Sequence, residues 1–347
     1  MTRGRANPSR RGVLALGAGA LGTVARPGRG GAQPGAKPAL VRIGHPTAPR
    51  AWVIGRHDGA FEAALGTRVE WFPFPSGGLA LQMLAAGRLD LAIFGNAPIV
   101  AGLGRGLPIQ ILGSPEVVAT SERLVVRPAI TEIKQLEGKR IAVAPSSTMA
   151  CALDAVIRIN RLDPAAIKRL PLGQPETIAA WTRGDIDGTY INGPFWGDLL
   201  GSGGRQLLVS GDLRPHGFLF WNSAVVRTDF AQRWPETVIA WLRTVQAQLD
   251  RYRADPEGTA RTLAEDFGAP FEPLRDTLAG LSYPTAQEQL GPKYWGRTAK
   301  ANTAPFLKAL SDTADFLIET GEIKRGGIPA ALGPFVNYDL LNRAFPA

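Results

Sequence analysis

Residues 86–98, AGRLDLAIFGNAP, decide the interpretation of this chain, because the same pattern returns at residues 183–194 as RGDIDGTYINGP. An apolar stretch with helical spacing precedes each copy, and Gly87 or Gly184 can take the left-handed conformation that ends a helix. A branched apolar residue, an aspartate and a short β-rich run follow. Asn-Ala-Pro or Asn-Gly-Pro then opens the next helix, since proline is tolerated in a first turn. Each copy therefore predicts a helix–strand–helix unit of an α/β sheet.

The repetition of this strand end predicts two similar lobes that face one ligand. Ligands of open α/β sheets bind beyond the carboxyl ends of the strands, and 347 residues are enough for two lobes with cores of their own. The expected fold class is α/β, with two doubly wound lobes joined by a two-strand hinge. We expect lobe 1 to comprise residues 38–126 and 226–347, and lobe 2 to comprise residues 127–225.

The alternation of predicted strands and helices along the chain supports this division into two lobes. Strands are expected in lobe 1 at 41–43, 68–74, 91–94 and 109–112, with helices at 51–65, 79–86 and 99–103 between them. An interruption of the first of these helices at Asp58-Gly59 is left open. Lobe 2 is expected to repeat the alternation from a first strand at 140–144, which a helix at 149–159 follows. The last third predicts a helical cover that completes lobe 1, with helices at 229–252, 259–266 and 305–319.

The formal charge of +9 is concentrated in the first residues of the chain. Six arginines lie among the first 36 residues, and no acid precedes Asp58; the remainder has 33 basic residues against 30 acidic ones. That remainder contains no Lys/Arg run of the kind that tracks phosphates, so we expect no nucleic-acid partner.

Residues 1–37 are expected to be a cleaved signal peptide and a link. Ser9-Arg10-Arg11-Gly12 precedes an Ala- and Gly-rich apolar run at 15–24, which is too short to span a bilayer. The paired arginines resemble a twin-arginine signal, which exports folded protein; an ordinary secretory signal is the alternative. Cleavage within residues 32–39 would release a soluble protein into the periplasm.

Signatures of enzymes are scarce. The sequence has no Gly-Lys-Ser/Thr phosphate loop, and its histidines show no metal-ligand spacing. Cys151 is the single cysteine, so it forms no internal disulfide, and we expect it to be a buried helix residue. We therefore predict no metal, no cofactor and no catalytic activity, while a Cys–His nucleophile pair stays open as an alternative.

Small hydroxyl, amide and glycine residues gather at the predicted strand-to-helix turns. Pro145-Ser146-Ser147-Thr148 precedes a helix whose N-terminus offers unpaired N–H groups and a positive dipole end to an oxyanion. Residues 76–78, 96–98 and 192–194 occupy corresponding turns. Together they predict a cleft lined with neutral donors, with neighbouring aromatic residues enclosing the carbon skeleton of a small ligand.

Several motifs resemble the taurine- and sulfonate-binding proteins of bacterial uptake transporters, a branch of the periplasmic clamshell proteins. They are AWTRGDIDG at 180–188, GKRIAV at 138–143, DGAFE at 58–62 and WPE at 234–236, and the resemblance runs from Val41 to Phe345. It implies a monomeric type II clamshell that holds a small sulfonate and delivers it to an ABC permease driven by a separate ATPase. By position, the resemblance places these residues at the ligand cleft: Ser76, Gly77, Asn96, Ser146, Ser147, Thr148, Tyr190 and Asn222. Residues of the same turns complete the predicted binding set: Thr47, Gly78, Ala97, Asn192 and Trp221.

Two departures from the family pattern leave the ligand open. Asn192-Gly193-Pro194 replaces an aromatic followed by Ala-Pro, and Asn222 stands where these proteins tend to place an acid that suits the ammonium of taurine. A buried ammonium without a carboxylate partner is costly. An amine-free sulfonate or another small oxyanion such as nitrate is therefore an alternative ligand. A desulfinase-like enzyme that uses Cys151 and a ligand-loaded sensor are alternative functions.

Overall fold

Both copies of the motif form the predicted unit in the computed structural model, which describes residues 37–298, 304–328 and 331–347. The first copy ends helix α2 (Gly77–Ala85), forms strand β3 (Leu91–Gly95) and begins helix α3 (Asn96–Gly104). The second ends α5 (Gln174–Arg183), forms β9 (Gly188–Asn192) and precedes α6 (Trp196–Gly201). Gly87 and Gly184 have φ angles of 67° and 81°, the conformation that was predicted for these turns.

The larger sheet has the strand order β12-β5-β11-β3-β1-β2, with β4 also paired to β11. Strand β1 is parallel to β2 and β3, whereas β11 runs antiparallel to β3, β4 and β5. The bounds are β1 Leu40–Pro46, β2 Arg68–Phe74, β4 Ile109–Ile111, β5 Glu116–Val118, β11 Trp221–Arg227 and β12 Leu281–Ser282.

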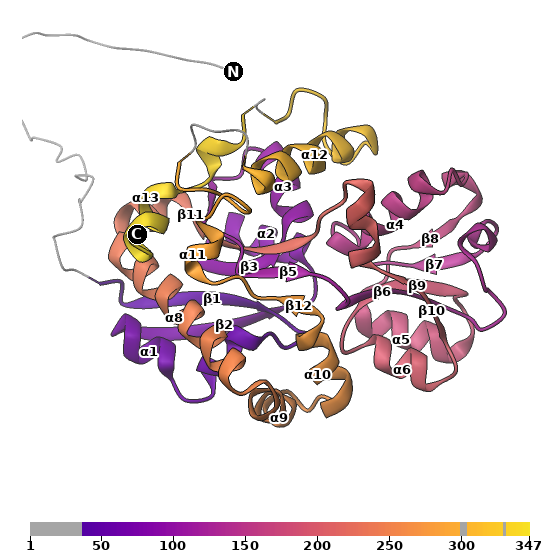
Figure 1. The fold of residues 1–347 in the computed structure, drawn as a ribbon, viewed down its shortest axis with the longest axis horizontal. Helices are drawn as coiled ribbons and strands as arrows, with labels where there is room; N and C mark the ends of the chain where they lie inside the picture. Colours follow the sequence, from indigo (N-terminus) through magenta and orange to yellow (C-terminus); the bar gives the residue numbers. More distant parts are fainter. Residues whose placement is uncertain (1–36, 299–303, 329–330) are drawn as a thin grey trace, which may run out of the picture.

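The smaller sheet has the order β10-β6-β9-β7-β8 and forms the second lobe, beside the first along the long axis of the molecule (Figure 1). Helix α4 (Thr148–Ile159) follows β7. The turn between them therefore lies at the carboxyl edge of the smaller sheet, as the β2–α2 turn lies at the carboxyl edge of the larger one. The remaining bounds are β6 Glu122–Val126, β7 Arg140–Ala142, β8 Lys168–Leu170 and β10 Arg205–Val209. The predicted α/β class with two lobes is confirmed.

The expected lobe boundaries need a correction. Strand β6 was placed in lobe 1, but it pairs with β9 and β10 of the smaller sheet. Strand β11 was placed mostly in lobe 2, but it pairs within the larger sheet from Trp221 onward. The chain therefore passes between the sheets at residues 119–121 and 210–220, earlier than the expected sites near Arg127 and Val226.

Helices of the last third cover the larger sheet, as predicted. The expected helix at 229–252 is two helices, α7 (Thr228–Arg233) and α8 (Pro235–Ala254), because the residue before a proline disfavours the helical conformation. Gly59, at φ 69°, likewise divides the expected helix at 51–65 into the 3-10 helix η1 (Ala51–Arg56) and α1 (Ala60–Leu65). The other helices are α9 Pro256–Phe267, α10 Phe271–Ala279, α11 Ala286–Gln289, α12 Pro305–Glu319 and α13 Tyr338–Ala344.

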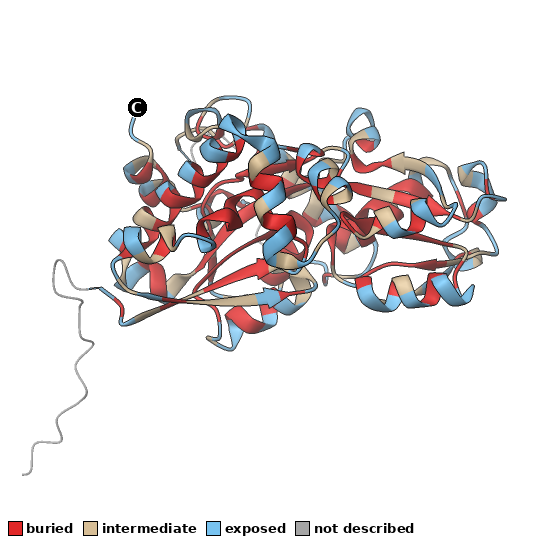
Figure 2. Cartoon of the chain, turned by 90° about the horizontal axis from the view of Figure 1, so that it is seen from below, coloured by how far each residue is buried: buried red, intermediate tan, exposed pale blue. Residues whose placement is uncertain are grey.

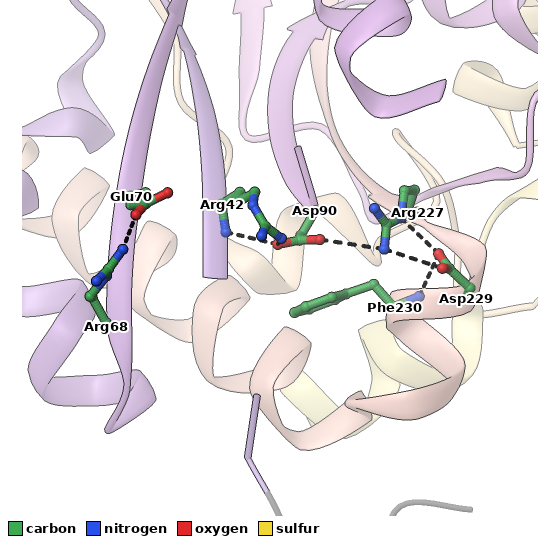
Figure 3. Close-up of polar contacts among 7 residues, drawn as sticks. All are labelled: Arg42, Arg68, Glu70, Asp90, Arg227, Asp229 and Phe230. Atoms are coloured by element: carbon green, nitrogen blue, oxygen red, sulfur yellow. Dashed lines mark hydrogen bonds and ion pairs between the residues drawn. The ribbon is translucent and has the colours of Figure 1, made fainter. Parts of the chain in front are cut away.

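Burial follows the layers, with the central strands of both sheets mostly buried and the outer helix faces exposed (Figure 2). Asp90 of the first motif copy is buried at the start of β3, where its carboxylate accepts the backbone N–H of Arg42 and faces Arg227 (Figure 3). No helix in the described part of the chain is long and apolar enough to cross a membrane. The predicted signal peptide lies almost wholly outside the described residues.

Candidate functional site

A cavity of about 50 Å³ lies between the lobes, at the carboxyl ends of strands from both sheets. Lobe 1 contributes the segment after β1, the β2–α2 turn, the end of β3 and the start of β11. Lobe 2 contributes the start of β6, the β7–α4 turn, the start of α5 and the end of β9. The cavity therefore lies where the doubled strand ends were expected to meet.

Six predicted binding residues line this cavity: Ser76, Gly77, Ser147, Thr148, Asn192 and Asn222. Ser76 and Ser147 are the N-caps of α2 and α4, and their hydroxyl oxygens accept the N–H of Leu79 and Ala150. The N–H groups in the first turn of a helix have no partner within that helix. Two helix N-termini from different lobes therefore open on one cavity, and each carries the positive end of a helix dipole.

A buried arginine adds a full positive charge to this cavity. Arg50 follows β1, is 6% exposed, and has no hydrogen-bond partner for Nε or Nη1 among the described residues. Its Nε lies 3.7 Å from Oε2 of Glu116, which also accepts a 2.7 Å hydrogen bond from Nδ2 of Asn222. Burial raises the pKa of Glu116, and the Arg50 charge opposes that rise. The guanidinium is thus held near a carboxylate while two of its donor nitrogens stay unused.

A buried carboxylate lines the same cavity from lobe 2. Glu122 begins β6, is 5% exposed, and accepts hydrogen bonds from Oγ1 of Thr148 (2.5 Å) and Oγ of Ser210 (3.1 Å). Burial raises the pKa of Glu122, while these two hydrogen bonds and the Arg50 charge lower it. The hydroxyl of Thr148 is therefore directed to Glu122 and supplies no further donor hydrogen to a ligand.

The expectation of neutral donors alone is therefore wrong for this cleft. Sequence reasoning missed Arg50, Glu122 and Gln174, which lines the cavity from the start of α5. A signal existed for Glu122, since this charged residue begins a strand whose last three residues, Leu124–Val126, are apolar. Arg50 lies between a strand and a helix without a motif of its own, and only the fold brings it to the cavity.

Three predicted residues of lobe 1 have structural contacts instead of a place in the cavity lining. The amide of Asn96 is fully buried, with Nδ2 donating to Thr313 and Oδ1 accepting the N–H of Trp221. Trp221 packs against Trp295 and Phe306. Ala97 is 3% exposed and packs in the lobe 1 core.

The other predicted residues lie near the cavity without lining it. Tyr190 is buried in lobe 2 and reaches Glu122 only through Ser210, whose Oγ lies 2.9 Å from the tyrosine oxygen. Thr47 lines a separate cavity of about 240 Å³. A Cβ added to Gly78 would lie 3.2 Å from Cβ of Ser146, so these two residues face each other across the lobe boundary.

The lobes also touch at Gly95, where an added Cβ would lie 2.4 Å from Cγ2 of Thr148. Gly95 ends β3 in lobe 1, and Thr148 begins α4 in lobe 2. The absence of a side chain at Gly95 therefore permits the lobes to approach.

Cys151 is buried on α4, as predicted, and lines a different cavity of about 330 Å³ together with His216. Burial raises the pKa of its thiol well above the usual value, while a nucleophilic cysteine needs the opposite shift. Across the described ranges, no group of three or more His, Cys, Asp or Glu residues is placed to hold a metal ion.

Known proteins share this architecture. The model of the NMT1-like family matches residues 35–265. The taurine-binding periplasmic protein of Escherichia coli (strain K12) is 30% identical over 304 residues, which cover 86% of this chain and 90% of that protein. The alkanesulfonate-binding protein SsuA from Xanthomonas axonopodis pv. citri, solved with MOPS, has a TM-score of 0.72 at 24% identity and covers 87% of this chain and 99% of its own.

An enzyme shares the fold as well. The desulfurization enzyme DSZB has a TM-score of 0.62 at 16% identity, covering 88% of this chain and 99% of its own. That degree of likeness concerns the fold and not the chemistry. The taurine-binding and alkanesulfonate-binding relatives above are binding proteins. The chain belongs to the NMT1-like family and has the two-lobed fold of the periplasmic sulfonate-binding proteins.

Proposed function

We propose that this protein is the periplasmic substrate-binding component of an ABC importer, and that it binds a small sulfonate between its lobes. The observation that carries the proposal is the buried Arg50, whose Nε and Nη1 lack partners in the cavity onto which α2 and α4 open. A buried donor without an acceptor is costly, so a ligand whose oxygens accept hydrogen bonds from Nε and Nη1 of Arg50 would satisfy donors that the ion pair with Glu116 leaves over.

The donor arrangement suits an oxyanion with several oxygen atoms. A guanidinium offers N–H groups in a rigid fork, and hydrogen bonds to charged partners are stronger than neutral ones. The N–H groups that begin α2 and α4 approach from the two lobes. The small volume of the cavity, about 50 Å³, argues against a bulky ligand.

Contacts from both lobes provide the driving force for closure. A ligand shifts an equilibrium between open and closed forms only through better contacts in one of them. Gly77 and Arg50 lie on lobe 1, whereas Ser147, Thr148 and Glu122 lie on lobe 2. A sulfonate that engages both sets would stabilise the closed form, which is the form a permease would accept.

A binding role also agrees better with Cys151 than a desulfinase role does. Its thiol lies in the cavity beside α12 and does not line the cavity that contains Arg50. Replacing Cys151 with Ser should leave ligand affinity unchanged; a thiol-dependent turnover of a sulfinate, lost in that variant, would favour the enzyme.

Calorimetry on the protein without residues 1–37 tests the binding function. Taurine, ethanesulfonate, sulfate and nitrate are the ligands, and we expect at least one sulfonate to bind more tightly than both inorganic anions. Arg50→Ala should weaken sulfonate binding by about tenfold or more, whereas the exposed Arg205→Ala should not. If wild-type protein binds no sulfonate at millimolar concentration, the ligand class is wrong.

We also propose export by the twin-arginine route, on the basis of Arg10 and Arg11. Replacing both by lysine should retain the precursor in the cytoplasm, as measured by cell fractionation. Unchanged export would indicate the general secretory route.

A further inference from the structure

Helix α12 is anchored in lobe 1, but its C-terminal end contacts lobe 2. Oγ1 of Thr313 accepts a hydrogen bond from Nδ2 of Asn96, so the middle of α12 is held on the first residue of α3. Glu319, the last residue of α12, forms an ion pair with Arg158 near the end of α4. The pair joins residues 161 positions apart and crosses the boundary between the lobes.

The surfaces of α4 and α12 that face each other are not closely packed. A cavity of about 330 Å³ lies between Cys151 of α4 and Phe316 of α12, and a second of about 650 Å³ lies between Ile157 and Glu319. A continuous apolar core would leave no such space, because protein interiors are close-packed. This contact therefore resembles an interface between domains, which can separate without disrupting either core.

The charges that line the larger of these cavities are complementary between the lobes. They belong to three arginines and an aspartate of lobe 2 and to two glutamates of lobe 1: Arg158, Arg161, Arg169, Asp154, Glu319 and Glu322. Lobe 2 therefore faces the cavity with an excess of positive charge, and lobe 1 faces it with negative charge. Opposite charges on facing surfaces attract, and like charges placed there would repel.

We propose that α4 and α12 form an electrostatic latch that stabilises the arrangement in which the lobes meet across the ligand cleft. In this arrangement Gly95 lies against Thr148, and the Arg158–Glu319 pair is made at the same time. Lobes that moved apart on this side would lose the pair. Because its two side chains are 57% and 55% exposed, water and salt weaken the attraction, so the latch shifts the equilibrium by a small factor and leaves the lobes free to move.

Cys151 provides a direct readout of this contact. It is the single cysteine of the chain, it is 3% exposed, and it lines the cavity between α4 and α12. A maleimide reaches a buried thiol only when the structure around it opens. The labelling rate of the ligand-free protein at fixed pH therefore reports how often α12 moves away from α4, and urea denaturation of each variant distinguishes this opening from a loss of global stability.

The variants reverse one charge, exchange both, or reverse a charge elsewhere. Glu319→Arg places an arginine opposite Arg158, and the double variant Arg158→Glu/Glu319→Arg exchanges the two charges. Glu257→Arg is the matched control, because Glu257 pairs with Arg261 within α9 of lobe 1 and that pair is as exposed as the latch pair.

At low salt, Glu319→Arg should be labelled about threefold to tenfold faster than wild-type protein, since repulsion replaces attraction. The exchanged pair should return the rate to within about twofold of wild type, and Glu257→Arg should leave it unchanged. Added sodium chloride should speed labelling of wild-type protein and slow that of Glu319→Arg, because salt screens attraction and repulsion alike.

An unchanged rate in Glu319→Arg, or the same increase in Glu319→Arg and in the exchanged pair, would overturn the latch. The result does not depend on the proposed function, because the protein carries no ligand. Taurine or ethanesulfonate added at saturation should slow the labelling of wild-type protein. If neither does so while the rates still follow the charges, the latch stands and the proposed sulfonate function is contradicted.

Discussion

The two copies of the repeated motif place an aspartate in the same position but in different surroundings. Oδ2 of Asp90 accepts the backbone N–H of Arg42 in β1 at 2.8 Å, and Oδ2 of Asp187 accepts that of Arg140 in β7 at 2.8 Å. In both lobes the aspartate therefore links the motif to the neighbouring parallel strand. The aspartate of the repeated pattern is explained by this hydrogen bond and has no part in the ligand cavity.

The two aspartates differ in how far they are buried. The Asp90 side chain is 2% exposed, with guanidinium nitrogens of Arg227 and Arg42 at 3.5 and 3.7 Å (Figure 3). The Asp187 side chain is 26% exposed, and Arg140 donates to both of its oxygens. Burial raises the pKa of Asp90, whereas hydrogen bonds from Arg140 lower the pKa of Asp187. The same local sequence pattern therefore places its aspartate in two different electrostatic environments, because different segments cover the two copies.

The asparagines that end the two strands differ in role as well. Asn96 is covered by α12 through Thr313 and by β11 through Trp221, so its amide is occupied within lobe 1. Asn192 lines the interlobe cavity and contacts Gln174 there. The comparison shows that the repeat specifies the strand end, while the later segments that cover it decide which of the two asparagines faces the cavity.

The largest expected effect is loss of stability in Asp90→Ala. The substitution leaves the Arg42 N–H and the Arg227 guanidinium without their buried partner, which should cost about 3 kcal/mol in the free energy of unfolding. Asp187→Ala should cost about 1 kcal/mol, because water reaches its partners. Urea denaturation of both variants measures the difference, and equal losses would contradict the assigned difference in burial.

Replacing each of the two asparagines in turn should separate an effect on stability from an effect on ligand binding. Asn96→Ala leaves the buried N–H of Trp221 unpaired and should lower the free energy of unfolding by about 1–3 kcal/mol, with ligand affinity little changed in the folded fraction. Asn192→Ala should weaken binding and cost less stability. Urea denaturation and calorimetry on both variants check this, and the reverse pattern would mean that Asn96, and not Asn192, contacts the ligand.

Closure should depend on the glycine that ends β3. In Gly95→Ala the new Cβ would meet Cγ2 of Thr148 at 2.4 Å, so the lobes would have to stay further apart. We expect affinity to fall by about tenfold with a smaller change in stability. Small-angle scattering with saturating ligand should show less compaction than in wild-type protein; identical compaction would show that this contact does not limit closure.

The smallest effects should be opposite pH trends for Asp90→Asn and Asp187→Asn. The pKa of Asp187 is lower in the folded than in the unfolded state, so its stabilisation exists above the unfolded pKa of about 3.8 and is lost as pH falls through the folded pKa. The pKa of Asp90 is raised on folding, so its contribution to stability diminishes as pH rises from about 3.8 through the folded pKa. The destabilisation by Asp187→Asn should therefore shrink toward acid pH, while that by Asp90→Asn should grow. Urea denaturation from neutral to acid pH measures both, and parallel trends would refute the difference in pKa.

Local sequence patterns predicted the helices and strands more completely than they predicted the residues of the cleft. Gly87, Gly184 and the strands that follow them were recognisable because turn chemistry and apolar periodicity act over short distances. The crossings were misplaced because the apolar parts of β6 and β11, Leu124–Val126 and Ala224–Val226, fit either sheet by sequence alone. Their assignment depends on pairing with distant strands.

The prediction of the cleft residues was limited in the same way to features that neighbouring residues determine. Ser76 and Ser147 were predicted because N-caps are local features. Arg50 and Glu122 were missed because a charge becomes significant only when the fold buries it, and their separation in the sequence gives no sign that they share a cavity.

A crystal structure of the protein with a bound short sulfonate tests the central claim most directly. The account predicts sulfonate oxygens within hydrogen-bond distance of the Arg50 guanidinium and of first-turn N–H groups of α2 and α4, with both lobes in contact with the ligand. A sulfonate found in the cavity beside Cys151 and α12, or held by one lobe without Arg50, would contradict it.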